Sequence, residues 1–234
     1  MASNRTREHF HIGILGGMGP EAGVLLQQLI IKATPVVKDQ DHIAVITYTN
    51  PHIPDRTESL ARDGGDSYVG VVIESLHVLE KAGVDVLVMA CNTAHARVAD
   101  IRKSIDTPLV DIVELARAKI SSTPGAVGIL ATNGTIGTGL FTKDQDPDKV
   151  ILPNADTQRE VMEIIHDIKK AGQTPAGVER LTTVVCTLQQ NGCAAFLLGC
   201  TELSICHDSL RERLGNVFID PMRLAASRLV ELAR

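Results

Sequence analysis

The sequence lacks several features that mark whole classes of protein. It has no tryptophan, aromatic residues make up only 3% of its 234 residues, and it has no long basic run or basic–aromatic pattern. Nucleic acid is therefore not an expected partner. No apolar stretch approaches the roughly 20 residues that a membrane helix needs, so no membrane partner is expected either. Residues 1–11 are polar and lack the apolar segment of a signal peptide, and residues 1–10 are expected to be a disordered leader.

A regular disulfide framework is also missing. The chain has five cysteines, an odd number without a repeating spacing, and a net charge of −5 from acidic and basic residues mixed along its length. This cysteine usage is typical of free thiols in a reducing cytoplasm, which is the expected location. The segment from Cys193 to His207 holds three cysteines and a histidine, but it lacks the C-x-x-C signature of zinc sites. Zinc is a minor alternative, and no metal is expected.

Short apolar runs alternate with helical segments along the whole chain. This alternation predicts parallel sheets whose strands are joined by right-handed crossovers. The expected strands cover residues 11–15, 43–49, 84–90, 109–112, 126–130, 150–152, 193–199 and 217–220. The expected helices cover residues 21–33, 67–82, 158–171 and 175–191, with one further helix starting near residue 95 and another at the C-terminus.

Three landmarks occur twice at a nearly constant spacing, which indicates duplication of a βα unit. The pairs are Gly13 and Gly128, 115 residues apart, and Cys91 with Cys200 and Asp111 with Asp220, each 109 residues apart. We therefore expect an α/β fold of two pseudo-symmetric domains, each a mostly parallel sheet flanked by helices. The first would comprise 1–112 plus 221–234 and the second 113–220, with the active site in the cleft between them, since ligands bind outside the carboxyl ends of such strands.

Cys91 and Cys200 each stand where an apolar run gives way to polar residues. Asn92 or Thr93 could cap the helix that follows Cys91, and the N-terminus of a helix favours a thiolate. Both cysteines could equally be inert core thiols, the commonest fate of a buried cysteine. Against that alternative, each precedes cap-forming residues and each comes from a different half of the chain.

The glycine-rich turn at 16–20 allows three interpretations. Residues 17–22 match the dinucleotide pattern G-x-G-x-x-A, but the expected acidic residue is missing at the end of the second strand, where Tyr48, Thr49 and Asn50 stand. A tight strand-to-helix turn explains the glycines without a ligand. Alternatively, the backbone N–H groups of the turn could bind a small carboxylate.

Two cations could together recognise a dicarboxylate. Arg56 lies in the two-proline loop expected at 50–59 and is capable of bidentate contact with a carboxylate. Lys170 lies two residues before Gly172, near the expected end of a helix. Each could also be a simple helix-end charge.

These motifs together resemble the cofactor-independent aspartate/glutamate racemase superfamily, and specifically its aspartate racemases. The stretches that carry the resemblance span nearly the whole chain in family order: 16–20, 53–56, 89–95, 164–172 and 198–202. The paired Cys-Asn-Thr and Gly-Cys-Thr-Glu motifs are highly specific when they occur together. The resemblance implies two α/β domains with a cleft, a homodimer, a small amino-acid dicarboxylate as substrate, and no pyridoxal phosphate or other cofactor.

The resemblance also implies roles for particular residues. It makes Cys91 and Cys200 the two acid/base residues. The substrate-binding residues that it implies are Met18, Asn50, Arg56, Asn92, Thr93, Ala94, Thr135, Lys170, Thr201 and Glu202. Lys169 is a second candidate for the position assigned to Lys170. His166 is a departure, because similar aspartate racemases often have tyrosine there.

The expected function is an amino-acid racemase that interconverts L- and D-aspartate by a two-cysteine, cofactor-independent mechanism. Two thiols on opposite faces of Cα would remove and return the proton, one as thiolate and the other as thiol. A relative acting on glutamate or another small carboxylate is the nearest alternative. A binding protein that keeps the carboxylate site without turnover, and a nucleotide-dependent enzyme, are alternatives from other classes.

Overall fold

The structure, a computed structural model, describes residues 10–234. The expected leader at residues 1–10 lies almost entirely outside this range. The chain folds into two compact units: the first extends to residue 112 and includes 222–234, and the second comprises 113–221. Each is described by itself below. No helix within residues 10–234 has the length and apolar character needed to cross a membrane.

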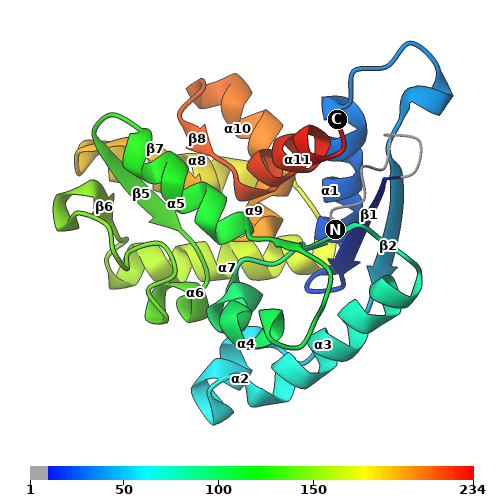
Figure 1. Cartoon of the computed structure of the whole chain (residues 1–234). Coiled ribbons are helices and arrows are strands. Elements are labelled where there is room, and N and C mark those ends of the chain that lie inside the picture. Colours follow the sequence, from blue (N-terminus) through cyan, green and yellow to red (C-terminus); the bar gives the residue numbers. More distant parts are fainter. Residues whose placement is uncertain (1–9) are drawn as a thin grey trace. The chain divides into compact units, whose positions relative to one another are not determined.

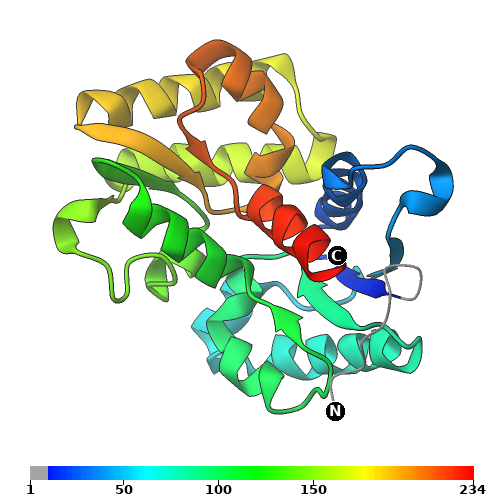
Figure 2. The same cartoon turned by 45° about the horizontal axis from the view of Figure 1, so that its top comes forward.

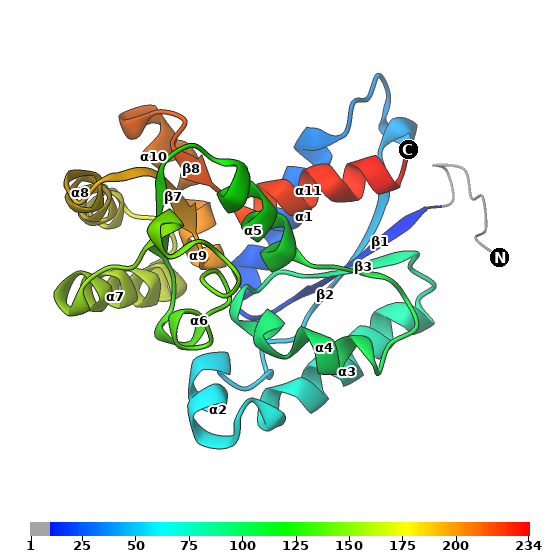
Figure 3. The ribbon, with the colours of Figure 1, turned by 60° about the vertical axis from the view of Figure 1, so that its left-hand side comes forward.

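The first unit is a parallel four-stranded sheet with helices on both faces. Its strand order is β2-β1-β3-β4. The strands are β1 (His11–Gly16), β2 (Ala44–Thr49), β3 (Val86–Met89) and β4 (Leu109–Val110). The helices are α1 (Pro20–Ala33), α2 (Arg56–Asp63), α3 (Asp66–Lys81), α4 (Val98–Arg102) and α11 (Pro221–Leu232), with 3-10 turns η2 (Asp39–Asp41) and η3 (Thr93–Arg97). Figures 2 and 3 show α1 and α11 on one face of this sheet and α3 and α4 on the other.

The second unit repeats this topology. Its strand order is β6-β5-β7-β8, again with every neighbouring pair parallel. The strands are β5 (Ala126–Leu130), β6 (Val150–Ile151), β7 (Cys193–Leu198) and β8 (Phe218–Ile219). The other elements are α5 (Ile112–Ser122), α6 (Asn133–Gly137), η4 (Pro147–Lys149), α7 (Ala155–Ala171), α8 (Pro175–Gln190), α9 (Thr201–Ile205) and α10 (His207–Leu214). Figures 1 and 3 show α7 and α8 side by side on one face and α5 on the other.

The central strands are buried because each is covered on both faces. All four residues of β3 are buried, as are five of the six residues of β7. A strand with two covered faces needs a continuous apolar run rather than an alternating one, which is how both segments read. The expected α/β fold with parallel, helix-flanked sheets is thus confirmed.

Three local expectations are wrong. Residues 56–59, expected in a loop, begin α2, because the Asp55 carboxylate accepts hydrogen bonds from the N–H groups of Thr57 (2.8 Å) and Glu58 (3.0 Å). Residues 133–137 form α6, although the sequence, with Gly134 and Gly137, predicts a glycine-rich turn over 131–137. After Cys91 the chain forms a 3-10 turn and then the five-residue α4, not one helix starting near residue 95.

Candidate functional site

The first thiol follows the central strand of the first unit. Ala90 extends the ladder beyond β3 by donating to the carbonyl of Leu15 at 2.9 Å. Cys91 comes next, with a free thiol in a residue that is 5% exposed. Because parallel strands all end at the same edge of the sheet, this position also lies near the ends of β1 and β2.

The loop after Cys91 is fixed by three hydrogen bonds to its carbonyl groups. The ring Nδ1 of the fully buried His95 donates to the carbonyl of Cys91 at 2.8 Å, and the backbone N–H of the same residue donates to Asn92 at 3.0 Å. The hydroxyl of Tyr68, buried in α3, donates to the carbonyl of Ala94 at 3.3 Å. The polypeptide that carries the thiol is therefore held in one conformation.

The side chain of Asn92 is polar, buried and unsatisfied. The residue is 2% exposed, yet neither its Nδ2 nor its Oδ1 has a hydrogen-bond partner among residues 10–234. Of the two residues expected to cap the following segment, Asn92 stands at its N-cap position but makes no capping hydrogen bond with its side chain. A buried amide without partners is unfavourable, and a ligand that carries a carboxylate or ammonium group would satisfy it. Thr93 and Ala94 are buried directly beside it.

The glycine turn after β1 lies against the end of β2. Gly17 has a φ of +101°, and a Cβ at this position would overlap the backbone carbonyl of Asn50. The amide side chain of Asn50 donates to Ser75 at 2.9 Å and accepts from the N–H of His52 at 3.0 Å. Met18, the next residue of the turn, is buried. The turn therefore packs tightly on the loop that leads to α2.

Arg56 is a buried cation that binds backbone carbonyls. It is 8% exposed, and its guanidinium donates to Ile53 (3.2 Å), Pro54 (2.9 Å) and Met18 (3.1 Å). Its buried Nε has no partner, and within residues 10–234 no carboxylate forms an ion pair with this side chain. A cation in the first turn of a helix also faces the positive end of the dipole. The arrangement therefore suits an anionic ligand.

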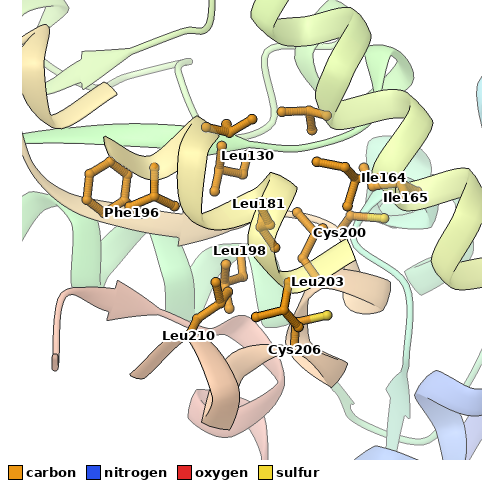
Figure 4. Packing of buried hydrophobic residues seen from close by; sticks show 14 of the residues in the cluster. Leu130, Ile164, Ile165, Leu181, Phe196, Leu198, Cys200, Leu203, Cys206 and Leu210 are labelled. Atoms are coloured by element: carbon orange, nitrogen blue, oxygen red, sulfur yellow. The ribbon is translucent and has the colours of Figure 1, made fainter. Parts of the chain in front are cut away.

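The second thiol follows the central strand of the second unit. Gly199 donates to the carbonyl of Leu130 at 2.7 Å, and Cys200 then stands at the N-cap of α9. Cys200 is 6% exposed and belongs to the apolar cluster of this unit, beside Ile164 and Ile165 of α7 (Figure 4).

The protonation of Cys200 differs from the sequence-based expectation. Its thiol donates to Oε2 of Glu202 at 2.8 Å, and Glu202 is itself buried. Burial raises the pKa of the Cys200 thiol well above its usual range, and the negative charge of Glu202 raises it further. The backbone N–H of Glu202, in the first turn of α9, does lower the pKa of the thiol, as a helix N-terminus is expected to, but burial and the Glu202 carboxylate outweigh it.

One lysine of α7 opposes this effect. The charge of Lys169 lowers the pKa of Cys200, although burial and Glu202 outweigh it. Both Lys169 and Lys170 are exposed in the last turn of α7, and Lys169 follows the buried Ile165 by one helical turn. The electrostatic coupling to the thiol thus belongs to the second of the two lysine candidates.

Two buried hydroxyls lie at the same edge of the second sheet as Cys200. Thr135 lies in α6, after β5, where its N–H donates to Thr132 Oγ1 at 3.1 Å. Thr201, also buried, follows Cys200 at the end of the neighbouring strand β7. Together with the thiol they line the carboxyl edge of the second sheet.

The structure therefore places the predicted residues in two groups, one at the carboxyl edge of each sheet. The first group contains Met18, Asn50, Arg56, Cys91, Asn92, Thr93 and Ala94, and the second contains Thr135, Cys200, Thr201 and Glu202, with Lys169 and Lys170 at the end of α7. The sequence-based reasoning missed the anchoring roles of Tyr68 and His95. No group of three or more His, Cys, Asp or Glu side chains in residues 10–234 is arranged to hold a metal ion.

Comparison with known proteins identifies relatives of this arrangement. Residues 15–229 match the profile of the family described as Asp/Glu/Hydantoin racemase. The chain is 29% identical over 138 residues to the broad specificity amino-acid racemase RacX of Bacillus subtilis, covering 56% of this chain and 59% of that protein. It is 26% identical over 169 residues to a glutamate racemase of Geobacter metallireducens, covering 69% of this chain and 62% of that protein.

Among solved structures, the aspartate racemase of Picrophilus torridus is similar over nearly its full length. The TM-score is 0.81 at 28% sequence identity, and the match covers 96% of this chain and 94% of that one. The chain spans less than two thirds of the length of the two curated relatives above, but the family profile covers almost all of it. With a thiol at the end of each central strand and this match, the chain belongs to the Asp/Glu/hydantoin racemase family.

Proposed function

We propose that this protein is an amino-acid racemase that interconverts L- and D-aspartate with two cysteines and no cofactor. The observation that carries the proposal is the repeated site: the central strand of each unit ends in a buried free thiol, Cys91 in one and Cys200 in the other. Racemisation removes a proton from one face of Cα and adds one to the opposite face, so it needs two acid/base groups. Membership of a racemase family supports this reaction class.

In the proposed reaction the Cys91 thiolate removes the α-proton and becomes a thiol. The Cys200 thiol then delivers its proton to the opposite face of Cα and becomes a thiolate. Burial and Glu202 favour the protonated form of Cys200 in the free protein, which is why we assign it the role of acid in this direction. The reverse direction uses the same groups with their roles exchanged.

The carbanion formed at Cα spreads its charge into the α-carboxylate. Without a cofactor to accept that charge, hydrogen-bond donors around the carboxylate must stabilise it. The unsatisfied amide of Asn92 supports a role of this kind in the first unit, and we assign the same role to the hydroxyls of Thr93 and Thr201.

The second carboxylate of the substrate would bind the cations. Arg56 is buried, has no ion pair within residues 10–234 and keeps one N–H unsatisfied, which supports a carboxylate-binding role. Lys169 or Lys170 would supply the second charge. The extensive match to an aspartate racemase favours aspartate. The glutamate racemase and the broad specificity racemase among the relatives make glutamate, or a wider substrate range, the alternative.

The homodimer implied by the family resemblance and the cytoplasmic location expected from the free cysteines remain predictions. Light scattering on the purified protein tests the first. Fractionation of the source cells tests the second.

A chiral assay of the purified protein tests the proposed function. L- and D-aspartate, L- and D-glutamate, and L- and D-alanine are each incubated without added metal or pyridoxal phosphate. We expect aspartate to racemise fastest from both enantiomers and alanine, which lacks the second carboxylate, to react slowest. Faster turnover of glutamate would favour the alternative, and no turnover of any substrate would refute racemase activity.

Replacement of each cysteine tests the two-thiol mechanism. Cys91→Ser and Cys200→Ser should both abolish racemisation in both directions, because a serine hydroxyl is far too weak an acid to replace a thiolate without a dedicated base. Cys186→Ser is the control, since Cys186 lies in α8, away from both strand ends. A folded Cys91→Ser or Cys200→Ser protein with near-normal turnover would refute the mechanism.

A further inference from the structure

The internal repeat extends beyond the two thiols. Four residues after Cys91 stands His95, and four residues after Cys200 stands Ser204. Each of these side chains faces an aspartate that directly follows the short fourth strand of its sheet, Asp111 after β4 and Asp220 after β8. All three pairs of positions are separated by the same 109 residues. In each unit, therefore, the residue four positions after the cysteine faces the aspartate that follows the fourth strand.

In the second unit the side chain of Ser204 is not needed to hold the segment that follows Cys200. Ser204 Oγ donates to Asp220 Oδ1 at 2.8 Å, and both residues are buried. The carbonyl of Cys200 accepts instead from the backbone N–H of Leu203 at 3.0 Å. This bond is available because α9 begins directly after the cysteine.

In the first unit the corresponding backbone hydrogen bond lies one residue further along the chain. The N–H of His95 reaches the carbonyl of Asn92, and the carbonyl of Cys91 accepts from the imidazole Nδ1 at 2.8 Å. On the other side of the ring, Nε2 lies 3.8 Å from Asp111 Oδ1, and the other oxygen of that carboxylate lies 3.6 Å from Arg102 Nη2. The carbonyl of Cys91 therefore accepts from an imidazole, whereas the carbonyl of Cys200 accepts from a backbone N–H.

We propose that His95, whose ring faces Asp111, is the positioning residue of Cys91. The ring holds the peptide group that follows Cys91 and thereby fixes the directions of the Cys91 and Asn92 side chains. The kinetic part of this inference rests on the proposed racemase function. The ring has a defined tautomer, because a carbonyl can only accept and Nδ1 must therefore carry a proton. Burial lowers the pKa of His95 while Asp111 opposes that shift, so the ring acts as a neutral donor.

Two substitutions separate positioning from packing. His95→Asn places an amide N–H close to where Nδ1 lies, whereas His95→Gln carries its amide further out, towards the place of Nε2. We expect His95→Asn to keep kcat for aspartate within about threefold of the wild type and His95→Gln to lower kcat roughly 10- to 100-fold with little change in KM, because small misplacements of reacting groups cost rates of this order.

A chemical readout makes the test independent of turnover. Iodoacetamide alkylation followed by peptide mapping reports each thiol separately. In His95→Gln the loosened loop should expose Cys91, so that it is alkylated faster than in the wild type while the rate for Cys200 is unchanged. His77→Gln is the matched control, because the ring of His77 also donates to a backbone carbonyl, that of Ser104 at 2.8 Å, but lies on the exposed side of α3. This variant should match the wild type in every measurement.

The outcomes are distinct. The inference is overturned if folded His95→Gln keeps wild-type kcat and wild-type alkylation of Cys91, or if His95→Asn and His95→Gln lose kcat and melting temperature equally. If His95→Gln does not fold, Asp111→Asn decides: we expect a smaller fall in kcat and faster alkylation of Cys91, and no change in either would overturn the inference. If the wild type racemises nothing, the proposed function fails, but the alkylation rates still test the positioning role.

Discussion

The thiol of Cys200 lies where two features of its surroundings disfavour a negative charge. It is packed among apolar side chains of α7 and α8, and its hydrogen bond ends on a buried carboxylate, that of Glu202. Both features raise the pKa of the thiol, and the more distant charge of Lys169 opposes them. Single residues around Cys200 therefore favour the protonated form of its thiol.

Glu202→Gln should lower the pKa of Cys200, because it removes the negative charge while keeping a polar group of the same size. A thiol loses its proton as the pH rises through its pKa, so Cys200 should become a thiolate at a lower pH in the variant than in the wild type. The pH dependence of Cys200 alkylation by iodoacetamide measures this shift, with the Cys91 peptide as the internal control. An unchanged profile, or a shift to higher pH, would contradict the assignment.

The adjacent lysines of α7 form a natural matched pair. Lys169→Met should raise the pKa of Cys200 further, since it removes the cation that lowers it, whereas Lys170→Met should leave that pKa unchanged. The same alkylation profiles test this difference. The KM for aspartate in the two variants shows in addition which lysine, if either, binds the dicarboxylate. Equal alkylation profiles would refute the distinction between them.

The elements next to the thiols are short and irregular, although the strands before them are regular. β1 and β7 could be predicted within one residue, because a doubly covered parallel strand must be a continuous apolar run. The 3-10 turn η3 could not, because its conformation depends on a hydrogen bond from a distant side chain, that of Tyr68, and the five-residue α9 could not, because its N-terminus has no side-chain cap that the sequence would reveal. At Cys200 the effect of the helix N-terminus on the pKa is outweighed by burial and by the Glu202 carboxylate, which are tertiary and local contacts that the strand pattern does not reveal.

The same limit applies to the candidate site. The motifs could identify the chemically distinctive positions, Cys91, Cys200 and Asn92, because the residue types themselves carry the information. The three carbonyl partners of Arg56 come from two loops that meet only in the folded unit, and the coupling of Lys169 to Cys200 depends on the rotation of α7. Contacts of this kind are tertiary and leave no local pattern in the sequence.

At the glycine turn, Gly17→Ala should be strongly destabilising. Its φ of +101° strains any L-residue, and a Cβ would overlap the carbonyl of Asn50. Gly192→Ala is the control, because Gly192 has a φ of +94° but nothing within 4 Å of its Cβ position. Strain alone should cost about 1–2 kcal/mol in the control. Urea unfolding should show a clearly larger loss for Gly17→Ala, and equal losses would contradict the close packing of turn and loop.

At the scale of the whole molecule, each unit has its own sheet and its own apolar cluster. Tyr68, Leu76 and Leu87 belong to the cluster of the first unit, and Leu181 and Phe196 belong to that of the second. The second unit, 113–221, is inserted between two segments of the first, since residues 222–234 return to it. Each unit therefore has its own core and carries its own thiol after its own central strand.

This organisation predicts that truncating a buried core side chain destabilises only the unit that contains it. Leu76→Ala in α3 and Leu181→Ala in α8 each truncate a fully buried side chain and should each lower the free energy of unfolding of their unit by about 2–5 kcal/mol. Native-state hydrogen exchange should show faster exchange in β1 and β3 for Leu76→Ala and in β5 and β7 for Leu181→Ala, because separately packed units open separately. Leu152→Ala, at a side chain that is 41% exposed, is the control and should change neither pattern. If either core variant accelerates exchange equally in both sheets, the two units open as one cooperative structure and the separation into independent halves is wrong.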